Sequence, residues 1–149
     1  MFKTSLLILS LAVLSGCSAV NAVVDPYTYL NFHVAEDVNP DRNGRPSPVV
    51  VKVYELSSRT VFDSQDFFSL YDDADAVLGP DLLVKDEFEF EPGEHVEFKM
   101  KINPNVRYAG LLVAYRDIEN ARWREVIEID RRGYDDVDIY VEALAVYQR

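Results

Sequence analysis

The chain has 149 residues, one cysteine and a formal net charge of −11. This length fits one ordinary domain, which can bury a hydrophobic core without disulfide bonds. The acidic charge argues against nucleic acid as a partner and against peripheral binding to anionic lipid headgroups, since both carry charge of the same sign. Sugars, peptides and proteins stay open as partners.

The N-terminal segment predicts export. Lys3 is followed by an apolar run over residues 6–14, and the run closes on Leu14-Ser15-Gly16-Cys17. A charged start, a short apolar stretch and small residues before a cut are the parts of a secretory signal peptide. The run is too short to span a membrane, which takes about 20 apolar residues. An ordinary signal peptide with a chance cysteine beside the cut is the alternative.

The string Leu-Ser-Gly-Cys resembles the lipobox of bacterial lipoproteins. The resemblance implies that residues 1–16 are removed and that Cys17 carries a covalent lipid, with no other cofactor. In Gram-negative lipoproteins an Asp after the cysteine usually retains the protein at the inner membrane. Ser18 therefore favours the outer membrane, with the protein facing the periplasm. We expect residues 17–25 to form a lipidated tether and residues 26–149 to form a single domain.

The mature chain reads mainly as strands, because apolar and polar side chains alternate with a period of two. The expected strands are residues 27–36, 48–56, 84–90, 96–102, 106–116, 123–130 and 137–147. The run 106–116 is more continuously apolar and is expected to be a central strand. The turn Glu91-Pro92-Gly93-Glu94 lies between two alternating runs and predicts a hairpin, and residues 117–120 predict a second one.

One segment departs from this alternation. Between Phe62 and Leu78, apolar side chains recur at spacings of three and four residues, which predicts a helix whose aromatic face packs on the sheet. Asp63 or Ser64 would cap it and Gly79-Pro80 would end it. We therefore predict a mainly β protein, a two-sheet β-sandwich with a small helical insertion at about residues 63–78.

The loop between the first two expected strands is unusually long and polar. It covers residues 36–48 and holds three prolines, which fix the backbone and remove hydrogen-bond donors. Asn39-Pro40 and Asn43-Gly44 are turn formers. A stiff polar loop is a good platform for a partner, because little ordering entropy is left to lose on binding. A plain solvated connection is the alternative.

Motifs within this loop are followed by others along the chain. In order, they are Asn39-Pro40-Asp41, Gly44-Arg45-Pro46-Ser47-Pro48, Val49–Leu56, Phe62, residues 66–71, 78–83, Pro92-Gly93, residues 108–117 and Trp123-Arg124. With these motifs the chain resembles the TssJ family of type VI secretion lipoproteins. The similarity extends over nearly the whole mature chain and includes the lipobox.

This resemblance implies a transthyretin-like β-sandwich and a structural role. Proteins of this family sit on the outer membrane and bind the periplasmic C-terminal domain of TssM, within a complex of TssJ, TssL and TssM. The contact uses the loop between the first two strands, which here maps to Val38, Asn39, Pro40, Asp41, Arg42, Asn43, Gly44, Arg45, Pro46 and Ser47. Arg42 and Arg45 can donate to a partner carboxylate, and Asp41 can accept from a partner arginine or backbone N–H. Solvation or pairing within the loop is the alternative for each.

Nothing in the sequence supports an enzyme or a small-molecule substrate. His33 and His95 fall on separate strands, whereas a zinc site takes three or four ligands. The acidic run 71–75 lacks the glycine and the closing glutamate of an EF-hand. The chain is expected to have no catalytic residue and no metal site. A periplasmic lipoprotein module that binds a glycan or a peptide is the alternative function.

Overall fold

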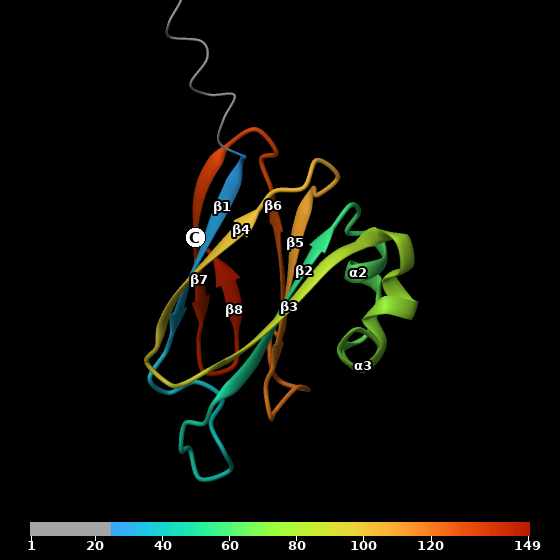
Figure 1. Ribbon diagram of the computed structural model, residues 1–149. Coiled ribbons are helices and arrows are strands. Elements are labelled where there is room, and N and C mark those ends of the chain that lie inside the picture. The colour runs from blue at the N-terminus through green and yellow to red at the C-terminus, as the bar shows by residue number, and fades with distance from the viewer. Residues whose placement is uncertain (1–24) are drawn as a thin grey trace, which may run out of the picture.

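Two four-stranded sheets face each other in the computed structural model (Figure 1), which describes residues 25–149. The expected signal peptide, Cys17 and all but the last residue of the tether lie outside the described residues. None of the described helices is long and apolar enough to cross a membrane. The strands are β1 (Tyr27–Val34), β2 (Val49–Leu56), β3 (Leu82–Phe90), β4 (His95–Lys101), β5 (Tyr108–Ala114), β6 (Arg124–Glu128), β7 (Tyr134–Val141) and β8 (Val146–Gln148).

The strand order is β4-β1-β7-β8 in one sheet and β3-β2-β5-β6 in the other. In the first sheet β1 runs antiparallel to β4 and parallel to β7. In the second sheet β5 lies between β2 and β6, so the prediction of a central strand here is confirmed. The predicted hairpin at residues 117–120 is also confirmed, since β5 and β6 pair antiparallel.

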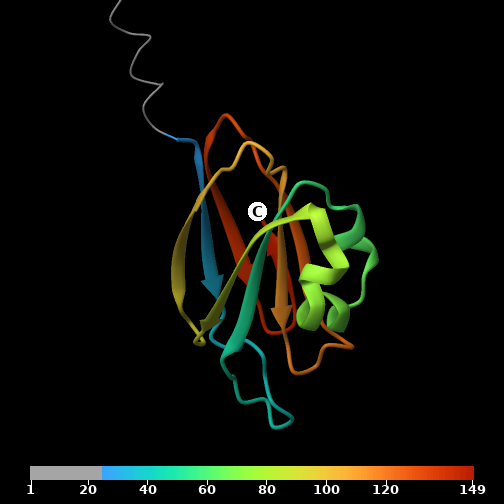
Figure 2. The same ribbon diagram turned by 45° about the vertical axis from the view of Figure 1, so that its right-hand side comes forward.

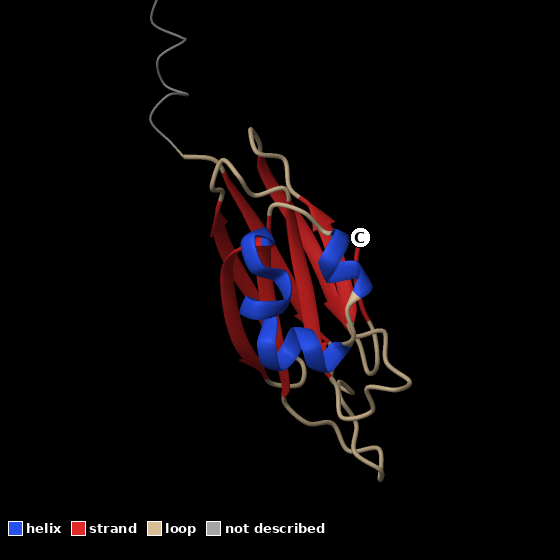
Figure 3. Ribbon diagram, turned by 90° about the vertical axis from the view of Figure 1, so that its right-hand side faces the viewer, coloured by secondary structure: helices blue, strands red, loops and turns tan. Residues whose placement is uncertain are grey.

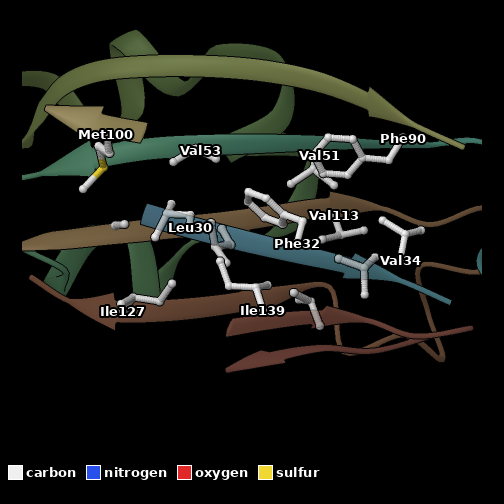
Figure 4. Packing of buried hydrophobic residues seen from close by; sticks show 14 of the residues in the cluster. Leu30, Phe32, Val34, Val51, Val53, Phe90, Met100, Val113, Ile127 and Ile139 are labelled. Atoms are coloured by element: carbon white, nitrogen blue, oxygen red, sulfur yellow. The ribbon is translucent and has the colours of Figure 1, made fainter. Parts of the chain in front are cut away.

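The core fills the space between the inner faces of the two sheets (Figure 4). Burial alternates strictly along β1, as a strand with one covered face requires. Leu30 and Phe32 on β1 pack toward Val51 and Val53 on β2, and none of the four is more than 1% exposed. The predicted fold class is therefore confirmed as a mainly β, two-sheet sandwich.

Helices cover the outer face of the second sheet (Figures 2 and 3). They are α2 (Thr60–Ser64), α3 (Phe67–Leu78) and the short 3₁₀ helix η2 (Gly79–Asp81). A second apolar cluster joins Tyr54 and Leu112 of the sheet to Leu70 of α3. The Tyr54 hydroxyl donates to the Leu70 carbonyl at 2.9 Å, which satisfies a phenol that packing removes from water.

The helical insertion exists, but its predicted start is wrong. Gln65 is extended and separates α2 from α3, so the segment is two helices. The residue that caps α3 is Asp66, whose carboxylate accepts from the Ser69 N–H at 3.0 Å. Phe68, one of the apolar residues between Phe62 and Leu78, is 62% exposed. The extended backbone at Gln65 and a non-helical residue, Asp73, within α3 interrupt the helical repeat, and the spacing of apolar residues does not reveal such breaks.

Two predictions of strand pairing are wrong. The predicted hairpin around Pro92-Gly93 does not form, because β3 pairs with β2 whereas β4 pairs with β1. The turn instead carries the chain from one sheet to the other. The predicted last strand over 137–147 is two strands, β7 and β8, which pair antiparallel with each other. Alternation identifies the buried face of a strand and says nothing of its neighbour.

Candidate functional site

The loop between β1 and β2 projects beyond one end of the sandwich, opposite the end where β1 begins (Figures 1 and 2). Pro48 directly precedes β2 and, because it has no N–H, keeps that strand from extending into the loop. Its residues divide into a buried base, which fixes the loop to the sandwich, and an exposed tip.

Val38 and Asn39 form part of the base. Val38 is fully buried and belongs to the main core cluster. Asn39 is 3% exposed and has a φ of 48°, a left-handed conformation that asparagine tolerates better than most residues. Its side-chain amide donates to the Pro48 carbonyl at 2.8 Å and its side-chain oxygen accepts from the Arg116 backbone N–H at 2.8 Å. These two residues therefore hold the loop in shape and have little surface to offer a partner.

Ser47 closes the base from the other side of the loop. Its hydroxyl donates to the Asn39 carbonyl at 2.5 Å and accepts from the Nε of Arg116 at 3.0 Å. The Ser47 N–H donates to the Val38 carbonyl at 3.2 Å. Arg116 thus binds the base through both its backbone and its side chain, which ties the loop to the end of β5.

Asp41 organises the tip from within. Its carboxylate accepts from the backbone N–H groups of Asn43 at 2.8 Å and Arg45 at 3.0 Å, and from the Nε of Arg45 at 2.8 Å. These hydrogen bonds, led by that of the Arg45 N–H, lower the pKa of Asp41. Gly44, with a φ of 75°, takes the left-handed position of the turn. Asp41 is therefore paired within the loop.

The exposed tip consists of Arg42, Asn43, Gly44, Arg45 and Pro46. The Arg45 side chain is 76% exposed despite its pairing with Asp41. Within residues 25–149, no hydrogen-bond or ion-pair partner reaches the Arg42 guanidinium. The tip is therefore a preorganised backbone with two exposed guanidinium groups, in a chain whose net charge is negative.

A second loop contributes to this end of the molecule. Arg116 and Asp117, which follow β5, lie beside the tip and form one side of a cleft of about 590 Å³. The other side is formed by loop residues Pro40, Asp41, Arg42 and Asn43. The sequence analysis did not identify Arg116 and Asp117 as one side of this cleft. The only signal was that Arg116-Asp117 ends a strand, and no local pattern connects that strand end to a loop far away in sequence.

Residues 25–149 hold no group of three or more side chains that could bind a metal ion. The side chain of Glu87 on β3 is 60% exposed. Asp72 and Asp73 of the acidic run are exposed on α3. The exposed guanidinium groups and the preorganised backbone of the loop tip suit binding of a macromolecule through hydrogen bonds and charge.

A family model described as type VI secretion lipoprotein, VasD, EvfM, TssJ, matches residues 26–144. The crystal structure of the T6SS lipoprotein TssJ1 from Pseudomonas aeruginosa has the same fold, with a TM-score of 0.82 and 32% identity. The match covers 85% of this chain and 96% of that one. No curated protein sequence matches this chain.

Two further solved structures share the fold. Serratia marcescens Lip, a membrane bound component of the type VI secretion system, is 24% identical with a TM-score of 0.76, over 83% of this chain and 96% of that one. A chain of a type VI membrane complex is 22% identical with a TM-score of 0.76, over 85% of this chain and 99% of that one. At these identities the likeness concerns the fold alone.

Proposed function

Since the chain belongs to the type VI secretion lipoprotein family that includes TssJ, we propose that it is an outer-membrane anchor of the secretion machine's membrane complex. In this proposal a lipid on Cys17 holds one end of the protein in the outer membrane. The β1–β2 loop at the other end of the sandwich binds the periplasmic C-terminal domain of TssM. The role is structural rather than catalytic.

TssM is favoured as the partner by one of the solved structures. A chain in the structure of the T6SS protein TssM C-terminal domain (869–1107) from EAEC has the fold of this protein, with a TM-score of 0.71 and 22% identity over 83% of this chain and 97% of that one. A fold found in that structure supports an association between the two kinds of protein. In this proposal the complex also contains TssL, and the shared fold of a chain in a type VI membrane complex supports membership of such an assembly.

The observation that carries the site is the rigidity of the loop. Half-buried hydrogen bonds of Asn39 and Ser47 close the base of the loop and join it to Arg116, so the tip loses little conformational entropy when a partner docks. The exposed guanidinium groups of Arg42 and Arg45 fit acidic or carbonyl groups on that partner. Arg116 and Asp117 enlarge the contact into a two-loop surface.

The position of the loop is consistent with a load-bearing anchor. The described chain begins at Asp25, beside the start of β1, and the loop lies at the opposite end of the sandwich (Figure 1). A tether from Cys17 to Asp25 reaches at most about 28 Å. The lipid and the loop thus hold opposite ends of one rigid body, which suits a protein placed between an outer membrane and an inner-membrane partner.

Binding to the purified TssM C-terminal domain of the same bacterium tests the proposal. Arg42→Glu, at the tip, should weaken binding by about tenfold or more, because it replaces attraction by repulsion at the proposed contact. Arg132→Glu is the matched control, since Arg132 is also exposed and lies at the opposite end, between β6 and β7. It makes the same change in net charge and should leave the affinity within about twofold.

Two outcomes would contradict the assignment. Equal losses from both variants would mean that net charge, and not the loop, governs binding. Unchanged binding by Arg42→Glu and by a variant with residues 42–46 replaced by glycine and serine would place the contact elsewhere. The base residues Val38, Asn39 and Ser47 stay in that second variant, so the sandwich and the loop attachment are preserved.

A further inference from the structure

The outward face of the first sheet brings the two histidines of the chain together. His33 on β1 and His95 on β4 are directly opposite each other in the antiparallel register. The Val34 N–H donates to the Glu94 carbonyl at 2.9 Å, so the adjacent pair, His33 and His95, is of the non-hydrogen-bonded kind. Side chains of such pairs lie closest across two strands.

The spacing of the two imidazoles matches that of two ligands on one metal ion. Their Nδ1 atoms are 3.2 Å apart. Two nitrogen ligands at about 2.0–2.1 Å from a tetrahedral zinc ion lie about 3.3 Å from each other. The two nitrogens are therefore already separated by the distance that two ligands of one zinc ion have.

His33 is also held in the orientation and tautomer that metal binding needs. Its Nε2 lies 2.8 Å from a carboxylate oxygen of Asp138 on β7, and since a carboxylate only accepts, Nε2 carries a proton. When the His33 ring is neutral, its lone pair is then on Nδ1, which lies at hydrogen-bond distance from Nδ1 of His95. A metal ion would take the place of the proton between the two nitrogens. Tyr140 stacks on the His33 ring at 4.9 Å between centroids and 19° between planes. A carboxylate behind a metal-binding histidine is the usual outer-shell arrangement.

We propose that His33 and His95 bind one imidazole-preferring divalent transition-metal ion, such as Zn²⁺, through their Nδ1 atoms, and that Asp138 positions His33. Water completes the coordination, because the described part of the chain offers no third protein ligand and His95 is exposed. The net charge of −11 raises the local concentration of cations. The proposal is independent of what the β1–β2 loop binds.

Titration of Zn²⁺ into the mature lipoprotein, in detergent and without a histidine tag, tests the site by calorimetry. The chain has only two histidines, so loss of one leaves no imidazole pair. We expect one Zn²⁺ per chain, and loss of this saturable binding in both His33→Ala and His95→Ala. Asp138→Asn should weaken binding by about tenfold or more. Asp136→Asn is the matched control, because Asp136 is an exposed carboxylate on the same face of β7, and should bind within about twofold of the wild type.

Imidazole ¹⁵N spectra provide the second readout, since Zn²⁺ should shift the Nδ1 signals of both rings and Asp138→Asn should change the tautomer balance of His33. Circular dichroism shows whether each variant is folded, and His95→Gln repeats the test with a polar side chain. Absence of Zn²⁺ binding by the wild type at millimolar concentration would overturn the proposal. So would wild-type affinity in the histidine variants, which would assign the ion to acidic groups. Wild-type affinity and spectra in Asp138→Asn would overturn the positioning role.

Discussion

Glu55 gives a prediction that tests the energetics of the sandwich directly. This carboxyl group lies on β2 and is only 5% exposed. Burial, with a smaller contribution from the like charge of Asp86, raises the pKa of Glu55 from 4.5 to about 7. Among the described residues, none donates a hydrogen bond to its carboxylate. The folded protein therefore holds a proton on Glu55 at pH values where the unfolded chain has released it.

The linkage between proton binding and folding gives the sign and size of the effect of Glu55 on the free energy of unfolding. Between pH 4.5 and about 7 the native state binds more protons than the unfolded state, so this group makes the free energy of unfolding fall as pH rises. Each unit of pKa difference is about 1.4 kcal/mol, and the loss is about 3 kcal/mol by pH 8. Glu55→Gln removes the ionisation and keeps the shape. It should stabilise the protein by up to about 3 kcal/mol at pH 8 and change little near pH 4.5.

Urea unfolding of the wild type and Glu55→Gln at a series of pH values between 4.5 and 8.5 measures this difference. The difference isolates Glu55, because all other titrating groups are common to both proteins. Glu87→Gln is the control: the side chain of Glu87 is 60% exposed on the neighbouring strand and pairs with Lys52 at 3.2 Å, so removal of its charge should not stabilise the protein at pH 8. A difference for Glu55→Gln that is flat with pH, or that grows toward acid, would refute the assignment of a buried carboxyl with a raised pKa.

Three further outcomes are expected. Asn39→Ala removes two hydrogen bonds at the loop base and should lower the free energy of unfolding, measured in urea, by about 2–4 kcal/mol. A loss below about 0.5 kcal/mol would mean that Asn39 does not anchor the loop base. Gly110→Ala should destabilise the folded protein by about 1–3 kcal/mol, because the added Cβ would lie 2.9 Å from the Phe62 ring. In thermal unfolding, the double variant with Phe62→Leu should recover part of this loss. Cys17→Ser should move the protein from the membrane to the soluble periplasmic fraction, and sedimentation of that variant with outer membranes would rule out the lipid as the anchor.

The elements themselves are largely local properties, and the sequence predicted most of them. Alternation along residues 27–34 marks one buried face, and both predicted strands form, although β2 is buried on both faces from Val53 onward. The apolar continuity around Leu111 and Leu112 identified the central strand. The prolines and turn formers of the long loop indicate the candidate binding segment from the sequence alone. Each of these signals comes from neighbours within a few residues in the chain.

Which strands and loops lie beside each other was decided only by the tertiary structure. The alternation on either side of Pro92-Gly93 is compatible with a hairpin and with a connection between two sheets. The packing of the two sheets selects the connection between sheets. Hydrogen bonds to Asn39 and Ser47 place Arg116 beside the β1–β2 loop. The register between β1 and β4 places His33 opposite His95. Neither contact can be predicted from neighbouring residues in the sequence. Sequence patterns record which face of a strand is buried, because burial depends on side-chain type. Which strand lies beside which depends on the summed packing of the whole core, and no local pattern contains that sum.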